Sequence, residues 1–265
     1  MQELPRRVRI GTRTIHVADD QPTFWDRVEA GRWEPGTLAL IERLVDGGTT
    51  FLDLGAWVGP TALYAATRAR RVLAVEADPA ALEQLKRNLA VNPDLAQRIE
   101  VVAGAIHARQ GPVTLGARRK AGDSMSSTLL AASEHTWTAA AITPAQLADR
   151  LRADEKLVIK MDIEGAEYAL LPHLGPLLDR AAAILVAFHP TILAAALGSN
   201  RDAARQTRAA LSALAGFTAY PVTAEGAGGR SLAPALIRWR LHTRLPADEW
   251  LFMRSAARDG YGTAR

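Results

Sequence analysis

Short apolar runs alternate with segments of helical periodicity through most of the chain after residue 49. Between residues 80 and 92, for example, Leu82, Leu85 and Leu89 share one helical face. The apolar runs expected to form strands cover residues 50–54, 71–77, 99–103, 157–162 and 183–188. This alternation predicts an α/β fold of the Rossmann-like, doubly wound kind, with a parallel sheet and helices on both of its faces.

The first 48 residues predict an attached lid rather than a second globular unit. Apolar and polar residues alternate enough over residues 7–17 to predict a hairpin around Gly11. Residues 24–45 are predicted to be mostly helical, with an interruption at the GRWEPG segment, 31–36. We therefore expect a lid over residues 1–48 and a single globular domain over residues 49–265.

Two later regions depart from the strand–helix rhythm. Residues 108–133 are rich in Gly, Ser and charge, which predicts a hairpin or loop insertion laid over the sheet. Near the C-terminus, strand-like runs at 236–241 and 250–253 follow a GAGG turn. We expect them to complete the sheet.

The composition of the chain limits where in the cell the protein is expected and what it is expected to bind. The 265 residues carry a formal net charge of +4 and no cysteine, which excludes disulfides and thiolate chemistry. The N-terminus lacks a signal-peptide core, and the longest apolar stretch, 181–188, is too short to span a membrane. Basic clusters near Arg6, Arg68 and Lys120 lack interleaved aromatic residues. We expect a cytoplasmic protein that binds neither membrane nor nucleic acid.

The first predicted strand runs into the sequence FLDLGAWVGP at 51–60, and the second ends in VEADP at 75–79. Gly55 and Gly59 bracket a turn that does not have the G-x-G-x-x-G spacing of a nicotinamide site. Asp53 precedes the turn and is expected to hold an ammonium group, while Glu76 is placed to accept both hydroxyls of a ribose. A ligand with carboxylate, ammonium, ribose and base is S-adenosylmethionine; the alternative is a tight turn beside a solvated Glu76.

Several segments together resemble the FkbM-type class I methyltransferases. They are FLDLGAWVGP, VEADP, the segment at 24–44 that leads into the first strand, the Ser126–Ser127 pair in the long loop, and VIKMDIEGAEYALL at 158–171. The Asp-x-Glu-Gly-x-Glu string in the last of these is the most specific element. The resemblance covers roughly residues 24–190.

The resemblance implies a seven-stranded sheet whose last two strands form an antiparallel hairpin. It also implies that Glu34 closes over the amino-acid end of the cofactor, although Glu34 can equally be an exposed loop acid. The turn residues Ala56 and Trp57, and Ala77 after the second strand, would contact the cofactor. The adenine would lie against residues 104–106, which include Gly104 and Ala105. Trp57 stands where the family commonly has Asn; it can pack against the lid or offer a π face to the sulfonium.

Candidate catalytic residues follow the fourth and fifth strands, where ligands bind in open α/β sheets. Asp162 ends the fourth strand and is the best polar candidate for contact with the acceptor or with the methyl-donating cofactor. Glu164 follows in the next turn, with Glu167 as a weaker candidate that can simply favour a helix N-terminus. His189 ends the fifth strand and is either a general base or a structural histidine. Asp162, Glu164 and His189 could also hold a divalent cation, but nothing in their spacing demands one and we expect no metal.

The sequence thus predicts a methyltransferase that uses S-adenosylmethionine, acting most readily on a hydroxyl of a small molecule such as a sugar or secondary metabolite. Ser126 and Ser127 are expected to line the acceptor pocket. Alternatives are N-, carboxyl or peptide methylation with the same cofactor, a nucleotide-binding oxidoreductase, or a non-catalytic binding module. The oligomeric state is not predicted.

Overall fold

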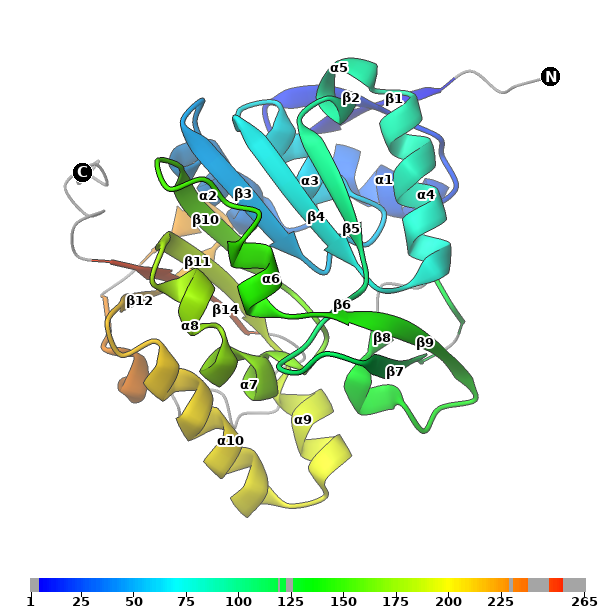
Figure 1. The fold of residues 1–265 in the computed structure, drawn as a ribbon. Helices are drawn as coiled ribbons and strands as arrows, with labels where there is room; N and C mark the ends of the chain where they lie inside the picture. Colours follow the sequence, from blue (N-terminus) through cyan, green and yellow to red (C-terminus); the bar gives the residue numbers. More distant parts are fainter. Residues whose placement is uncertain (1–4, 119, 123–125, 229–230, 238–247, 255–265) are drawn as a thin grey trace.

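The computed structural model describes residues 5–118, 120–122, 126–228, 231–237 and 248–254. At its centre lies a sheet of eight strands in the order β13-β12-β14-β11-β10-β3-β4-β5 (Figure 1). These strands are β3 (Thr49–Leu54), β4 (Arg71–Glu76), β5 (Ile99–Ala103), β10 (Lys156–Met161), β11 (Ala181–Phe188), β12 (Thr218–Thr223), β13 (Gly226–Ala227) and β14 (Asp248–Met253).

The strand directions explain where a ligand can bind. Strands β11, β10, β3, β4 and β5 are parallel, and β14 lies antiparallel between β11 and β12. Because β3 lies between β4 and β10, the chain changes direction across the sheet there, which opens a crevice at the carboxyl ends of these strands. The predicted α/β fold is confirmed. The sheet has one strand more than the seven expected, since the two-residue β13 pairs with the end of β12.

Helices cover both faces of the sheet, as the alternating pattern predicted (Figure 1). On one face lie α1 (Pro22–Glu29), α2 (Pro35–Leu44), α3 (Pro60–Ala66) and α4 (Pro79–Ala90). On the other lie α6 (Pro144–Ala148), α7 (Glu167–Leu170), α8 (Gly175–Leu178) and α10 (Asn200–Ala213). The remaining helices are α5 (Pro93–Ala96), α9 (Pro190–Leu197) and the 3₁₀ turns η1 (Thr128–Leu130), η2 (Leu171–His173) and η3 (Pro234–Leu236).

Proline begins many of these helices, because its fixed φ suits the first turn and its missing N–H would have no helical partner there. Helix α4 adds a side-chain cap: Asp78 accepts hydrogen bonds from the N–H groups of Ala80 and Ala81. At the start of α6, Thr143 and Gln146 form a capping box. These local signals fix the helix starts that face the carboxyl edge of the sheet.

The N-terminal segment forms the predicted hairpin, β1 (Arg6–Ile10) paired with β2 (Arg13–Val17). Its apolar residues Val8, Ile10 and Ile15 are buried in the same core as Phe51 of β3. The lid therefore shares the hydrophobic core on one face of the main sheet. The division at residue 48 stays a prediction.

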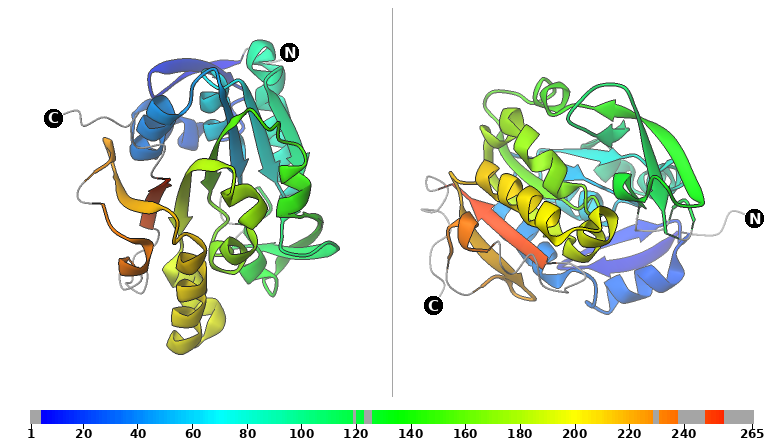
Figure 2. Two further views of the ribbon diagram at one scale, coloured as in Figure 1. Left: turned by 60° about the vertical axis from the view of Figure 1, so that its left-hand side comes forward. Right: turned by 90° about the horizontal axis from the view of Figure 1, so that it is seen from below.

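The region predicted as an insertion belongs to a second, smaller sheet of order β6-β9-β7-β8. Its strands are β6 (Ala105–Ile106), β7 (Pro112–Ala117), β8 (Ser126–Ser127) and β9 (His135–Ile142). The sequence analysis did not predict β9. Figure 2 shows from two further sides that this sheet lies beside the main one.

Of the strand-like run predicted at 236–241, residues 238–241 lie outside the described part of the chain. The run predicted at 250–253 lies within β14. No helix in the described ranges has the length and apolar character needed to cross a membrane.

Candidate active site

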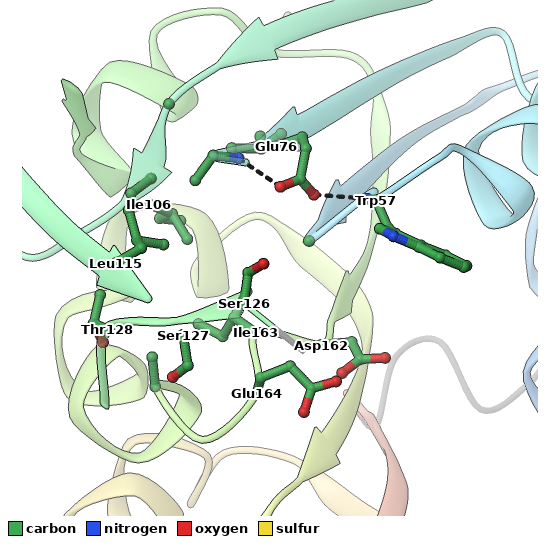
Figure 3. A pocket seen from close by; sticks show the side chains of 16 residues that line it. Trp57, Glu76, Ile106, Leu115, Ser126, Ser127, Thr128, Asp162, Ile163 and Glu164 are labelled. Carbon is green, nitrogen blue, oxygen red and sulfur yellow. Dashed lines mark hydrogen bonds between the residues drawn. The ribbon is translucent and has the colours of Figure 1, made fainter. Parts of the chain in front are cut away.

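The residues singled out from the sequence gather at the carboxyl edge of the main sheet. Gly55 follows β3, Glu76 ends β4, Gly104 follows β5, Asp162 follows β10 and His189 follows β11. Two adjoining pockets open there. The first is lined by Gly55, Trp57, Val75, Glu76, Ala77, Gly104, Ala105, Ile106, Leu115, Ser126, Ser127, Thr128, Asp162, Ile163, Glu164 and Ala166 (Figure 3).

The turn after β3 can only be built with glycine at its first position. Gly55 has φ +88°, and a Cβ added to it would lie 1.9 Å from the carbonyl oxygen of Asp162. The N–H groups of Gly55 and Ala56 both donate to the carbonyl of Val75, at 3.0 Å. The turn therefore brings β3, β4 and β10 into contact at the floor of the first pocket.

Glu76 is fixed at the end of β4 by backbone donors. Its Oε2 accepts a hydrogen bond from the N–H of Trp57 at 2.7 Å, and its Oε1 accepts from Ala77 and Asp78 at 2.8 and 2.7 Å (Figure 3). Burial raises the pKa of Glu76 to about 7, although these backbone hydrogen bonds lower it. The carboxylate is thus held in one orientation on the wall of the pocket.

Trp57 packs against the lid, which was one of the two interpretations left open. Its ring meets that of Phe24 edge to face at 4.5 Å between centroids, and Phe24 meets Trp33 at 5.3 Å. The indole Nε1 donates to the carbonyl of Gly122 at 3.1 Å. Trp57 lines both pockets, so this packing joins the lid to the site.

The second pocket is strongly polar and contains Glu34, the residue predicted to close over the cofactor. Its full lining is Phe24, Arg27, Trp33, Glu34, Gly55, Ala56, Trp57, Pro60, Thr61, Lys160, Asp162 and Glu164. Glu34 Oε2 is buried and accepts no hydrogen bond from the described residues. Burial, reinforced by neighbouring carboxylates, raises the pKa of Glu34 to about 8.

Asp53 is fully buried within β3 and lines neither pocket, but it contacts Thr61, which lines the second pocket. Its Oδ2 accepts a hydrogen bond from Thr61 Oγ1, whereas its Oδ1 has no hydrogen-bond donor among the described residues. Burial raises the pKa of Asp53 to about 6. An unpaired carboxylate oxygen here and another on Glu34 would suit a cationic ligand group.

Lys160 and Glu249 also belong to the charged site, and the sequence analysis missed both. Lys160 is only 5% exposed, and its Nζ lies 3.2 Å from Asp162 Oδ2. Burial lowers the pKa of Lys160, but the surrounding carboxylates outweigh burial and raise it. A lysine inside the apolar strand LVIKM was the available signal. Glu249 reaches the site because β14 is antiparallel and begins at this edge.

His189, Asp162 and Glu164 come together beside the two pockets. His189 Nε2 lies 3.4 Å from Glu164 Oε2 and 3.7 Å from Asp162 Oδ1. On its other side, His189 Nδ1 lies 3.1 Å from Oε1 of the buried Glu167. Figure 3 shows the two pocket carboxylates, Asp162 and Glu164, next to each other at the edge of the first pocket.

The protonation of this cluster differs from the expectation for a free histidine. Burial lowers the pKa of His189, but Glu167 and the two other carboxylates outweigh burial and raise it to about 10. The imidazole is therefore protonated at neutral pH as long as no other cation neutralises the negative charge of these carboxylates. Burial raises the pKa of Glu164 to about 8, whereas Lys160 and His189 overcome burial and lower that of Asp162.

Ser126 and Ser127 line the first pocket together with Glu76 and are absent from the lining of the charged one. Ser126 Oγ donates to Asp78 Oδ2 at 2.9 Å, and Ser127 Oγ accepts from the N–H of Leu129 at 3.1 Å. Both hydroxyls are thus engaged within the protein, on the side of the site where Glu76 lies.

Backbone strain is concentrated at the site. Four non-glycine residues of the described chain have positive φ, and three of them, Glu34, Trp57 and Glu164, line the pockets. Such conformations cost roughly 1–3 kcal/mol each and persist where the surroundings impose them. Local strain thus coincides with the residues singled out for function.

The methyltransferase FkbM domain family matches residues 53–214, more than half of the chain. No curated protein sequence matches. Solved structures similar to the chain include the precorrin-6y C5,15-methyltransferase of Geobacter metallireducens (13% identity, 83% of this chain, 87% of that chain, TM-score 0.42). The chain is also similar to the fibrillarin pre-rRNA processing protein of Methanococcus jannaschii (14% identity, 96% of this chain, 84% of that chain, TM-score 0.46). A third similar structure is an rRNA methylase of Streptococcus thermophilus (11% identity, 84% of this chain, 95% of that chain, TM-score 0.43). Likenesses this remote do not identify an acceptor.

The chain belongs to the FkbM methyltransferase family. It is a methyltransferase that uses S-adenosylmethionine, as the turn after β3 and the FkbM resemblance predicted.

Proposed function

We propose that the protein transfers the methyl group of S-adenosylmethionine to a hydroxyl oxygen of a small molecule, such as a sugar or secondary metabolite. The observation that carries this proposal is the meeting of Asp162, Glu164 and His189 beside the two pockets. Asp162 and Glu164 line both pockets, so an acceptor bound beside them would also lie beside the cofactor.

The cofactor would extend through both pockets, with its nucleoside in the first and its methionine end in the second. Glu76, held by three backbone N–H groups, would accept the ribose hydroxyls, and the adenine would lie in the first pocket against Ala77, Gly104 and Ala105. The methionine end would enter the charged pocket past the turn formed by Gly55, Ala56, Trp57 and Gly59. There the unpaired oxygens of Glu34 and Asp53 would receive its ammonium group.

The reaction needs positioning first and a proton acceptor second. Methyl transfer is an in-line displacement at a carbon already activated by its sulfonium, so alignment supplies most of the rate. A hydroxyl acceptor must also lose its proton. Asp162 is ionised and could accept a hydrogen bond from that hydroxyl. His189 would act as a base only once the charge of the surrounding carboxylates is compensated.

Ser126 and Ser127 take a different role in this proposal from the one expected. Their hydroxyls are committed to Asp78 and to the turn at Leu129, so they would shape the nucleoside pocket rather than hold the acceptor.

A small-molecule acceptor is favoured over nucleic acid by the ion pairing of several arginines in two of the basic clusters. Arg6 contacts Asp19, Asp26 and Glu29, and Arg68 contacts Glu42. Arg71 likewise pairs with Glu100. Arginines neutralised in this way contribute little to binding phosphates.

Labelled S-adenosylmethionine tests the acceptor class. We expect radioactivity from its methyl group to appear in a small-metabolite fraction, in a product that survives mild base. Transfer mainly into RNA or protein, or into a base-labile methyl ester, would contradict the proposal.

A further inference from the structure

We propose that Asp162, Glu164 and His189 form a binding site for a divalent cation, which activates the acceptor hydroxyl. The spacing of these residues along the sequence gave no reason to expect a metal. Their arrangement in the structure does give one, because the three side chains converge. The catalytic role of the cation rests on the proposed oxygen methylation, whereas its binding site stands on the geometry alone.

The three side chains offer one ligand atom each at suitable separations. All three atoms lie within 4.8 Å of one another, and Nε2 of His189 is 3.4 Å from Glu164 Oε2 and 3.7 Å from Asp162 Oδ1. Two ligands at about 2.1 Å from one ion are themselves roughly 3.0–3.5 Å apart at tetrahedral or octahedral angles. The two distances from Nε2 of His189 lie within or close to this range, and rotation of the carboxylate side chains would bring their oxygens, no more than 4.8 Å apart, around one ion.

These ligand atoms have no other hydrogen-bond partners in the described ranges. Asp162 Oδ1 and Glu164 Oε2 are buried and accept no hydrogen bond. His189 is only 6% exposed, and its hydrogen bond to Glu167 uses Nδ1, which leaves Nε2 facing the two carboxylates. Buried polar atoms are nearly always satisfied, so two unsatisfied carboxylate oxygens that lie beside the same imidazole nitrogen indicate a missing cationic partner.

A second layer of contacts orients the ligands. Glu167 accepts hydrogen bonds from the N–H groups of Ile163 and Gly165 at 2.9 and 2.8 Å, and its Oε1 lies against His189 Nδ1. A carboxylate that holds Nδ1–H leaves the lone pair of a neutral imidazole on Nε2, as in carboxylate–histidine–metal arrangements. Lys160 occupies the other oxygen of Asp162 and leaves Oδ1 directed at the site.

The local backbone and charge agree with this assignment. Glu164 has φ +54°, an unfavourable conformation for a residue with a side chain, and Gly165 follows at φ +100°. Three carboxylates surround His189, so the site gains from positive charge. A divalent ion would supply that charge and leave the imidazole neutral.

The donor set indicates the class of ion. One imidazole and two carboxylates suit first-row divalent ions such as Mn²⁺ better than Ca²⁺, which prefers six to eight oxygen ligands. Three protein ligands leave coordination positions open toward the pocket. A hydroxyl there would have a lowered pKa and would release its proton to water. Its oxygen would then form the new bond to the methyl carbon as the carbon–sulfur bond breaks, and the electron pair would go to sulfur.

Mn²⁺ binding to the full chain tests this inference without acceptor or turnover. Metal-free protein, prepared with a chelator, is titrated with Mn²⁺ while the electron paramagnetic resonance signal of free Mn²⁺ is recorded. We expect one saturable site per chain, weakened about 10- to 100-fold by Glu164→Gln and by His189→Ala. Glu83→Gln removes an exposed carboxylate on α4, which pairs with Lys86 outside the site, and should bind Mn²⁺ as the unmodified protein does.

Calorimetric titration with S-adenosylhomocysteine shows which variants retain their fold. The absence of saturable Mn²⁺ binding in protein that binds S-adenosylhomocysteine would overturn the inference. Equal Mn²⁺ affinity in a folded Glu164→Gln variant and the unmodified protein would do the same. Neither result depends on the acceptor, so the cation site and the proposed oxygen methylation can fail separately.

Discussion

Nδ1 of His189 lies 3.1 Å from Oε1 of Glu167, a carboxylate with no exposed surface. Glu167 is itself held by the N–H groups of Ile163 and Gly165, so it cannot follow the imidazole if the ring turns. The orientation of His189 is therefore set by the DIEGAE segment, and the two parts of the site act as one unit.

Replacing Glu167 with Gln should reduce turnover while sparing the cofactor site. The amide keeps the size of the side chain but removes the charge that orients His189 Nδ1, and a lost orienting contact of this kind costs about 10- to 100-fold. We expect kcat to fall by that factor, with S-adenosylhomocysteine affinity unchanged by calorimetry. A fall in kcat that is matched by lost cofactor affinity would instead mean that Glu167 only maintains the fold.

Replacing Glu76 with Gln should weaken cofactor binding. Hydrogen bonds to a charged group contribute about 1.5–3 kcal/mol, so we expect the Kd for S-adenosylhomocysteine to rise about 10- to 100-fold. Glu83→Gln, an exposed site on α4 that pairs with Lys86, is the matched control and should leave the Kd unchanged. An unaltered Kd in Glu76→Gln would refute the ribose contact.

Cofactor affinity should also depend on pH through Glu76. Because burial raises the pKa of this carboxyl to about 7, its ionised form is progressively lost as the pH falls below that value. The ionised form is the better acceptor for ribose hydroxyls, so S-adenosylhomocysteine should bind more weakly at about pH 6 than at about pH 8. The same titration on Glu76→Gln serves as the check, since a pH dependence that survives in this variant must come from another group.

Gly55 should be the most sensitive position of the turn. Its φ of +88° and the 1.9 Å approach of the Asp162 carbonyl leave no room for a Cβ. Gly55→Ala should therefore lower the free energy of unfolding by about 2 kcal/mol or more, measured by chemical denaturation. Gly47→Ala introduces the same methyl group where no atom lies within 4 Å. Equal stability of the two variants would show that the turn can relax.

Much of the fold could be predicted because its signals are local. The alternation of apolar runs and helical segments, the prolines at helix starts and the Gly55 turn all depend on neighbouring residues. Strand β9 was missed because HTWTAAAI has only two large apolar residues, Trp137 and Ile142, and three consecutive alanines between them, so no period of two stands out.

The site was predicted only in part because its remaining features depend on tertiary contacts. The environment of Glu249 follows from the antiparallel insertion of β14, which no local pattern specifies. Ser126 lines the first pocket because the long loop returns to Asp78, 48 residues away along the chain. The shifted pKa of His189 likewise requires Glu167 and Asp162, which the sequence places far from it.

The protein is proposed to methylate a hydroxyl oxygen. Nuclear magnetic resonance of a product made with [methyl-¹³C]S-adenosylmethionine tests the identity of that acceptor atom most directly. The chemical shift of the labelled methyl carbon distinguishes a methyl ether from an N-methyl group, and its coupling to neighbouring protons locates the modified position. We predict a methyl ether on a small molecule, formed more slowly by Glu164→Gln. A labelled N-methyl group or carboxyl methyl ester would contradict the proposed methylation of a hydroxyl.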